Sequence, residues 1–598
     1  MPYLNFKGYI MNFNSYIFIL VFLPLTVAGY YILGKRKAVY ANIWLICASF
    51  IFYAYASVSY LLLLFVSMVV NYGLSIWIKK SCTSVCRKQN SENNKSLFDD
   101  FKINNHVRKD KNVPFSKKQS KYKELSSNGK CSIIISAKTI LIFGLIFNIG
   151  LLFYFKYYDF FIDSINSVFK TDMPLLNLSL PLGISFYTFG QIAYLVDVYR
   201  GEIVDSSIID YALFTSFFPK ITQGPICLYG DMVKKFHKDG NMKNYYSESD
   251  THRGRSSEDY DITCKSNKVE NKDIVGNSNK GENFKVNYES MTRGIIMFVL
   301  GLFKKVMIAD SLGSAVTSGF ALVNFGDIAS GITSTTTITS ADVFLVMLCY
   351  TFQIYFDFSG YCDMASGISL MLGIELPINF DSPYKALTIT DFWKRWHISL
   401  TSFLRKYLYF PLGGNRKGTV RTYVNMMIVF LVSGLWHGAN WTFVVWGLMH
   451  GAFQVLHRMT RNVFDKLPAI IKYVITFAFV NIAWLLFRAD SIGEWAFMVK
   501  KAFSFSNMTF TSSIIENFKI PKMRSVLEIL GVSYTDDAVY LIGTALMTIF
   551  CFVLCLVPQN NQRRDFELNK KTLVIVLFML IICVLNLSNV SSFLYYNF

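Results

Sequence analysis

The chain has 598 residues, of which 53% are hydrophobic and 16% are aromatic, and its formal net charge at pH 7 is +19. This composition excludes a soluble domain, because apolar stretches of about 18–25 residues, long enough to cross a hydrocarbon core of about 30 Å, recur along the chain. The charge does not indicate a nucleic-acid partner, since much of it lies in polar loops beside apolar stretches. The 11 Cys form no CxxC pair and no Cys/His cluster, so the sequence predicts no disulfide framework and no metal site.

The apolar stretches predict an all-α polytopic membrane protein with about 11 spans. The expected spans are 15–33, 39–57, 59–78, 135–157, 181–199, 293–310, 341–372, 422–456, 468–488, 537–557 and 571–593. The stretch 422–456 is too long for one simple crossing and is expected to break near Gly434 and Gly438. The segment 207–226 is short and interrupted by proline and glycine, which favours a re-entrant or interfacial element surrounded by protein.

The basic loops predict the orientation of the chain. The stretch GKRK at 34–37 follows the first span, and residues 79–130 contain 14 Lys and Arg against 5 Asp and Glu. Two spans separate these loops, so both lie on one face of the membrane. Placing both in the cytoplasm satisfies the preference for positive charge there and puts the N-terminus outside. The polar composition of 80–130 and 237–290 is typical of disordered inserts, and both are expected to be cytoplasmic.

The segment 376–421 is not apolar enough to span, but it is dense in aromatic and basic residues. The aromatic residues recur at helical spacing, which predicts a helix lying at the membrane interface. The helix is expected to start near Thr390, with Thr388 or Thr390 as its N-cap. Trp396 and His397 both lie on this helix.

The stretch SGLWHGANW places His437 between two apolar runs, and an ionisable group at such depth is usually functional. If 422–440 is one helix, Ser433 and Asn440 share the face of His437. A neutral imidazole can take a proton from an attacking hydroxyl near neutral pH, which suits acyl transfer to an alcohol. The alternative is a structural histidine hydrogen-bonded to a neighbouring span.

Other polar residues in apolar surroundings point to packing. His450 lies 13 residues after His437, roughly 220° around an ideal helix, so it is not expected to share that face. For His397 the alternative to a catalytic role is an interfacial histidine satisfied by a neighbouring side chain or a lipid headgroup. Asp357 and Asp363 are expected to form structural ion pairs. Their expected partners are Lys394, Arg395 or Arg416.

Long stretches of the sequence resemble the membrane-bound O-acyltransferase family. They are DFSGYCDMASGISLMLGIELPINFDSPY (357–384), DFWKRWHISLTSFLRKYLYFPLGGNRKG (391–418) and SGLWHGANWTFVVWGLMHG (433–451). LPLGISFYTFGQIAYLVDVYRG (180–201) and FFPKITQGPI (217–226) are similar to the alginate O-acetyltransferase branch of the family. The run PLGGNRKG favours that branch over the branch that transfers D-alanine to teichoic acid. The resemblance covers most of the chain outside the two polar inserts.

The resemblance implies a ring of tilted helices around a central tunnel, which an acyl donor enters from the cytoplasm and an acceptor from outside. His437 matches the family's general base, and His397 matches its second histidine, at the cytoplasmic side of the tunnel. The residues expected to line the tunnel are Ser433, Asn440, Trp436 and Trp396. The implied core comprises 131–236 and 291–465, between N-terminal spans in 1–79 and C-terminal spans in 466–598.

The resemblance further implies transfer of an acyl group, acetyl in this branch, to an extracytoplasmic polysaccharide at a bacterial cell membrane. Acetyl-CoA is the expected donor, and no bound cofactor is expected. The acceptor is a polysaccharide or a secreted or periplasmic transferase that completes the reaction. The alternatives are D-alanyl transfer to teichoic acid and a non-catalytic glycan transporter or flippase. A transporter is disfavoured because the sequence has no second copy of the WHGANW stretch.

Overall fold

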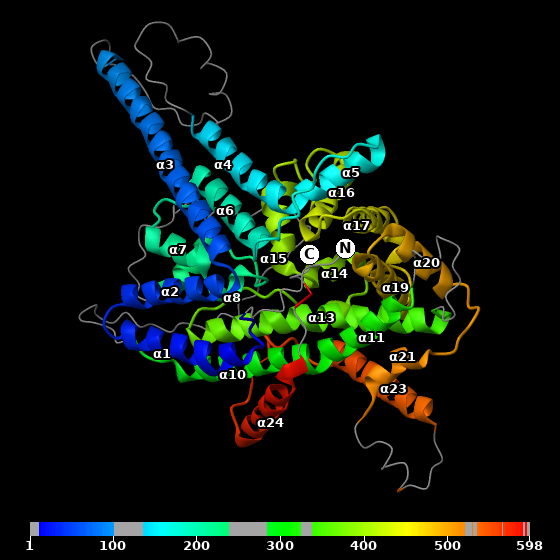
Figure 1. Cartoon of the computed structure of the whole chain (residues 1–598). Helices are drawn as coiled ribbons and strands as arrows, with labels where there is room; N and C mark the ends of the chain where they lie inside the picture. The colour runs from blue at the N-terminus through cyan, green and yellow to red at the C-terminus, as the bar shows by residue number, and fades with distance from the viewer. Residues whose placement is uncertain are drawn as a thin grey trace.

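The computed structural model shows an α-helical protein, with no strand among the residues it describes (Figure 1). The described residues are 11–100, 136–237, 284–323, 338–520, 529, 535–564, 566–589 and 593–594, with only the backbone described over 83–100. This confirms the all-α polytopic prediction. Seven helices of the described part are long and apolar enough to cross a membrane, and Phe18–Gly34 is a shorter apolar helix. The seven are Ala38–Ala56, Val58–Cys82, Ala137–Phe169, Ser340–Met371, Thr419–His437, Ala469–Arg488 and Asp536–Leu556.

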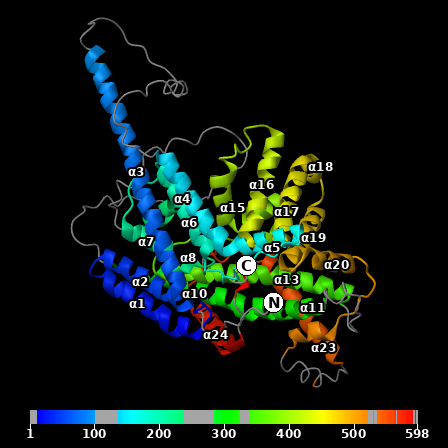
Figure 2. The same cartoon turned by 45° about the horizontal axis from the view of Figure 1, so that its top comes forward.

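The N-terminal helices begin with a π-helical turn, Phe18–Phe22, that continues into α1 (Leu23–Gly34). They continue with α2 (Ala38–Ala56), α3 (Val58–Asp100), α4 (Ala137–Leu152) and α5 (Tyr158–Phe169), of which the last two form one continuous helix through the π-helical turn Phe153–Tyr157. In both views α3 projects beyond the other helices (Figure 2). The insert expected from residue 80 therefore starts as helix, because α3 runs on to Asp100, and the expected disorder of 101–130 lies outside the described residues. The expected insert 237–290 likewise ends in helix from Tyr288, and its residues 238–283 lie outside the described part.

The core of the molecule is organised around α13 (Ser340–Met371), which is almost entirely buried and is capped by reciprocal hydrogen bonds between Thr339 and Asp342. The helix formed by α10 (Tyr288–Phe303), the turn Lys304–Ala309 and α11 (Asp310–Ala321) runs along it (Figure 1). An ideal Cβ placed on Gly301 would lie 2.5 Å from the carbonyl oxygen of Gly360, so glycine permits this close helix contact.

Two buried acidic residues of α13 form ion pairs with the neighbouring helix. Lys305 Nζ lies 2.6 Å from Asp357 Oδ1 and 2.9 Å from Asp310 Oδ1, and Lys304 Nζ lies 2.7 Å from Asp363 Oδ2. The prediction of structural ion pairs is confirmed, but the predicted partners in 394–416 are wrong. The carboxylates lie where α13 packs against the turn Lys304–Ala309, and sequence spacing does not reveal that contact.

The segment between α6 (Ile184–Tyr199) and the core consists of α7 (Ile208–Ser216) and α8 (Phe218–Ile221), followed by α9 (Tyr229–Phe236). These helices are too short to span a membrane, as expected for 207–226. Most of their residues are buried. The irregular backbone around Gly224 is thus surrounded by protein, which is the condition for such a segment at membrane depth.

The expected interfacial helix is wrong in two respects. It is interrupted, because α14 (Ile389–Arg395) and α15 (Ile398–Leu404) are separated at Trp396 and His397, and His397 has a φ of 45°. The aromatic side chains from Phe392 to Phe403 are buried in the core rather than exposed at an interface, and only the end of the segment, at Tyr407 and Phe410, is half-buried or exposed. The sequence could not separate these cases, since an aromatic stripe at helical spacing suits both a lipid interface and a protein core. The N-cap is confirmed at Thr388, whose side chain accepts a hydrogen bond from the amide of Asp391.

The long stretch 422–456 forms a hairpin of α16 (Thr419–His437) and α17 (Trp441–Met459). The predicted break is confirmed at Gly438, whereas Gly434 lies within α16 and provides close packing. An ideal Cβ on Gly434 would lie 2.3 Å from the carbonyl oxygen of Phe443 on α17. Because α16 ends at His437, the expected shared face with Asn440 is wrong. Asn440 instead caps α17, accepting a hydrogen bond from the amide of Thr442 at 3.0 Å.

The C-terminal helices complete the fold. They are α19 (Ala469–Arg488), α20 (Ile492–Ala502), α23 (Asp536–Leu556) and α24 (Lys570–Asn586). Helix α19 packs against α13, where Thr351 donates a hydrogen bond of 2.7 Å to the side chain of Asn481. In Figure 1, α23 and α24 lie on the opposite side of α13 from α15, α16 and α17.

Candidate active site

Two buried histidines from different segments lie close together. The ring centroids of His397 and His437 are 6.4 Å apart, and the two residues are 0% and 3% exposed. Each lies at a helix break, His397 before α15 and His437 as the last residue of α16. The indole of Trp436 packs against both imidazoles. Its ring centroid lies 5.8 Å from that of His397 and 4.9 Å from that of His437. The fold therefore brings both predicted catalytic residues and one predicted tunnel residue to one place.

Hydrogen bonds to Asn379 fix the tautomer of His397. The backbone amide of Ser399 donates to Asn379 Oδ1 at 3.2 Å, which identifies this atom as the carbonyl oxygen. His397 Nδ1 lies 3.1 Å from the same oxygen and must therefore carry the proton. Nε2 then holds the lone pair, and it has no hydrogen-bond partner among the described residues. Burial lowers the pKa of the His397 imidazole, so the ring is neutral and its Nε2 can accept a hydrogen bond.

Asn379 belongs to a hydrogen-bonded chain that the sequence analysis missed. The Ser399 hydroxyl donates to Asn379 Oδ1 at 2.8 Å and accepts a hydrogen bond from the amide of Ile226 at 3.0 Å. The backbone amide of Ile398 donates to the backbone carbonyl oxygen of Asn379, at 3.0 Å. These bonds tie the break at His397 to the segment after α13 and to the loop after α8. The signal in the sequence was an amide residue within the stretch INFDSPY, but nothing in the spacing linked it to His397.

The C-terminal end of α16 is held by a lysine from the continuous helix of α4 and α5. Lys156 Nζ donates to the carbonyl oxygens of Trp436 at 2.7 Å and His437 at 3.0 Å. The Tyr157 hydroxyl donates to the carbonyl oxygen of Leu435 at 2.7 Å. Helix ends leave such carbonyl groups without intrahelical donors, and a cation there is favoured by the helix dipole. The sequence analysis missed both residues, although a lysine within the apolar run 135–157 was a signal.

Aromatic rings surround the histidine pair. Measured between ring centroids, His437 lies 5.2 Å from Trp446 and 5.3 Å from Phe487. The ring centroid of His397 lies 4.9 Å from that of Phe358. Such walls exclude water and strengthen electrostatic interactions inside the site.

The other predicted tunnel residues lie in different surroundings. Trp396 is fully buried and stacks on Phe392 at 5.6 Å, so its contacts are those of a core residue. Ser433 is buried on α16, one turn before His437, and Asn440 caps α17 at a partly exposed position. Their place along a tunnel stays a prediction.

His450 is bound within the aromatic core. Its Nδ1 accepts a hydrogen bond of 3.3 Å from Trp393 Nε1, and its ring lies 4.6 Å from Trp446. Trp446 also contacts His437, so both histidines reach the same indole. The break at Gly438 places them on antiparallel helices, and the angle expected for one continuous helix does not apply. The contacts of His450 agree with a packing role.

Comparison with known proteins adds to this geometry. The sequence profile of the membrane-bound O-acyltransferase family matches residues 145–491, which is more than half of the chain. The chain belongs to the membrane-bound O-acyltransferase family. The matched region includes Lys156, Asn379, His397 and His437, so the whole site lies within the part that is common to the family. The protein is thus an O-acyltransferase, and the transporter alternative is not favoured.

Individual relatives in the family differ in how much of the chain they cover. The peptidoglycan O-acetyltransferase of Helicobacter pylori is 34% identical over 99% of this chain and 98% of its own length. The probable alginate O-acetylase of Pseudomonas aeruginosa is 33% identical over 83% of this chain and 75% of its own length. The teichoic acid D-alanyltransferase of Streptococcus thermophilus is 26% identical over only 46% of this chain and 56% of its own length. The two O-acetyltransferases are thus similar over much more of the chain than the D-alanyltransferase.

Proposed function

We propose that this O-acyltransferase transfers acetyl groups to hydroxyls of an extracytoplasmic glycan, and that the glycan is peptidoglycan. The similarity to the Helicobacter peptidoglycan enzyme supports this acceptor, because it extends over nearly the full length of both chains. The similarity to the alginate enzyme leaves about a sixth of this chain uncovered. The acceptor receives the acetyl group directly or through a secreted transferase. The protein acts in a bacterial cell membrane, with its N-terminus outside.

The single observation that carries the proposal is the pair of buried imidazoles with ring centroids 6.4 Å apart. Two imidazoles this close can serve one reaction centre, where an acceptor hydroxyl meets a thioester carbonyl. His437 takes the proton from the acceptor hydroxyl as its oxygen attacks the carbonyl carbon. The carbon–sulfur bond then breaks, and the departing thiolate receives that proton, so the imidazole returns to its neutral form. The products are an ester and a thiol, and no electrons are exchanged.

His397 faces the donor in this proposal. Its proton stays on Nδ1, bound to Asn379, and Nε2 accepts a hydrogen bond from an amide N–H in the carrier part of the acyl donor. The donor is an acetyl thioester, and in this proposal it is acetyl-CoA. The neutral rings and aromatic walls suit this chemistry, because a charged base would be costly in such surroundings.

The experiment measures ester-linked acetate on glycans from cells that lack the protein. Cells are complemented with the wild-type chain, with His437→Gln, or with His450→Gln as a matched control in the same hairpin. We expect acetate on purified peptidoglycan to return with the wild type and the control but not with His437→Gln. If acetate returns only on a secreted polysaccharide, that polysaccharide and not peptidoglycan is the acceptor. If D-alanine esters return instead of acetate, the transferred acyl group is D-alanyl. Full restoration by His437→Gln would overturn the mechanism.

A further inference from the structure

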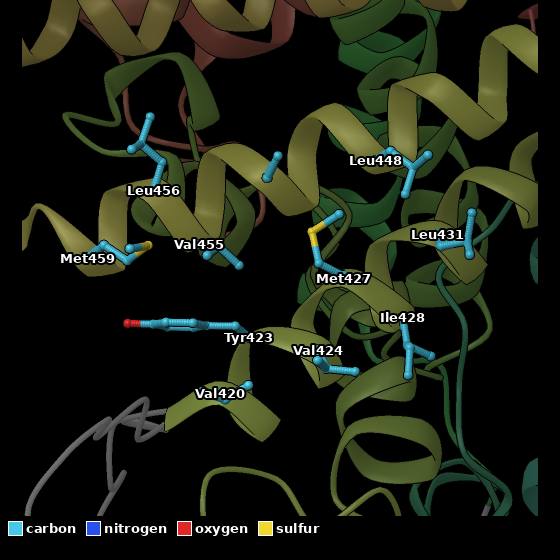
Figure 3. A pocket seen from close by; sticks show the side chains of 11 residues that line it. Val420, Tyr423, Val424, Met427, Ile428, Leu431, Leu448, Val455, Leu456 and Met459 are labelled. Carbon is cyan, nitrogen blue, oxygen red and sulfur yellow. The ribbon is translucent and has the colours of Figure 1, made fainter. Parts of the chain in front are cut away.

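An apolar groove lies between the two helices of the hairpin that carries His437 (Figure 3). Its volume is about 490 Å³, within the range of sites for small ligands. Val420, Val424 and Leu431 line it from α16, and Leu448, Ala452 and Met459 line it from α17. We propose that this groove binds an acyl chain of an anionic phospholipid and that basic residues at one end of the groove bind its headgroup.

The groove has two chemically different ends. At one end Tyr423 lies between Val420 and Met459 (Figure 3). Residues 415–421 and 456–466 flank this end, and each segment contributes three Lys or Arg, against one acidic residue in both together. The opposite end of the hairpin, residues 433–443, contains no Lys, Arg, Asp or Glu, and Lys156, which lies beside it, is bound to the carbonyl oxygens of Trp436 and His437. The exposed cations at the Tyr423 end favour an amphiphile that binds with its anionic headgroup there.

The basic residues at this end are available to a phosphate group. Arg416, Arg421 and Arg458 are exposed, and no ion pair within the described parts of the chain involves them. Arg461 pairs with Asp465 at 3.3 Å, on a surface where such pairs contribute little. Basic pockets between membrane helices are typical binding sites for anionic lipid headgroups.

The length of the groove favours a lipid over a partner helix. Its lining on α16 runs from Val420 to Leu431, which at 1.5 Å per residue is about 17 Å. One leaflet is half of a hydrocarbon core of about 30 Å, so the groove matches the acyl chain of a single leaflet. A transmembrane helix from a partner or a second copy would need a contact surface across both leaflets. Beyond Leu431, α16 and α17 are instead closed against each other at Gly434 and Gly447.

The test titrates the purified full-length protein with phosphatidylglycerol or with phosphatidylcholine of the same acyl chains. Thermal unfolding reports binding, since a ligand of the folded state raises the unfolding temperature. We expect phosphatidylglycerol to bind more tightly. The double variant Arg421→Gln/Arg458→Gln should weaken its binding about 25-fold, at about 5-fold per cation. The matched control Lys35→Gln/Arg36→Gln removes two cations at the end of α1 and should leave binding unchanged.

A second variant tests the apolar part of the groove separately from the charges. Ala452→Trp places a large side chain in the groove, and we expect it to reduce binding of both lipids. Equal binding of the two lipids by the wild type would overturn the proposal, as would unchanged binding in the double variant. A dimer in detergent that dissociates on Ala452→Trp would assign the groove to a second copy instead. If Ala452→Trp does not fold, phosphatidylglycerol binding by the double variant Arg421→Gln/Arg458→Gln still tests the proposal.

Discussion

The two helix breaks at the site hold their histidines in different ways. At the first break the positive φ of His397 turns the chain, and a side-chain amide, Asn379, binds the imidazole itself. At the second break Gly438 is extended, and Lys156 binds the backbone carbonyl groups at the end of α16 rather than the ring of His437. The first arrangement fixes a proton on a chosen nitrogen, and the second fixes the position of a helix end. At His397 the structure therefore fixes which ring nitrogen carries the proton, and at His437 it fixes the position of the backbone.

His450 provides the contrast to both breaks. It lies inside the uninterrupted helix α17, where its neighbours hold it from all sides and Trp393 donates a hydrogen bond to its ring. All three histidines are buried to a similar degree. Burial therefore does not separate a histidine with a proposed chemical role from a packing residue, whereas a place at a helix break does.

The largest expected effect follows from removing the second imidazole. His437→Ala should lower the acetyl transfer rate about 10²–10⁴-fold, which is the usual contribution of a positioned general base. The variant should accumulate in the membrane as the wild type does, since α16 and its contact with Lys156 do not depend on the ring. Steady-state transfer of labelled acetate by the purified protein measures the effect. A rate within threefold of wild type would make His437 a structural residue.

Asn379→Ala tests the first helix break, at His397. It should lower the acetyl transfer rate about tenfold to a hundredfold, because His397 loses a buried hydrogen bond. Asn379→Asp keeps an acceptor and should recover part of the rate. Its carboxylate raises the pKa of the imidazole, because it stabilises the charged ring. The acidic limb of the pH–rate profile should then move to higher pH, since the reaction needs the neutral form. An unshifted profile would show that Asn379 acts only on the backbone.

Lys156→Met tests the other break and should have a smaller effect. It leaves the carbonyl oxygens of Trp436 and His437 without their cationic donor, which we expect to reduce the rate about threefold to tenfold. Lys138→Met is the control, because this exposed lysine lies near the start of the same continuous helix. If both lysine variants behave alike, the ammonium group does not position His437.

The smallest effect on catalysis is expected for His450→Ala. Loss of its contacts with Trp393 and Trp446 should destabilise the protein by about 1–3 kcal/mol. The rate per folded molecule should change less than threefold. Thermal unfolding and transfer kinetics on the same sample separate the two quantities. A stable but inactive variant would show that His450 takes part in catalysis. A position at a helix break would then no longer distinguish the catalytic histidines from a packing histidine.

Local sequence patterns predicted the features that depend on neighbouring residues. Apolar length indicated the spanning helices, the Thr388 cap marked the start of α14, and the glycine at 438 marked the end of α16. These features follow from backbone geometry and burial, which act over a few residues. The depth of His437 in apolar sequence, together with the family resemblance, was enough to single it out. The orientation of the chain rests on charge alone and stays a prediction.

The sequence by itself thus determined the membrane class, most helix positions and the two candidate histidines. Only the tertiary structure decided that His397 lies at a break in the core instead of on an interfacial helix. It also decided that Asn379 and Lys156 hold the two breaks, and that Lys304 and Lys305 pair with the acids of α13. The physical reason is that these contacts join groups that are 18 to 281 residues apart. Helical periodicity states which face a side chain occupies, but the packing of helices decides what meets that face.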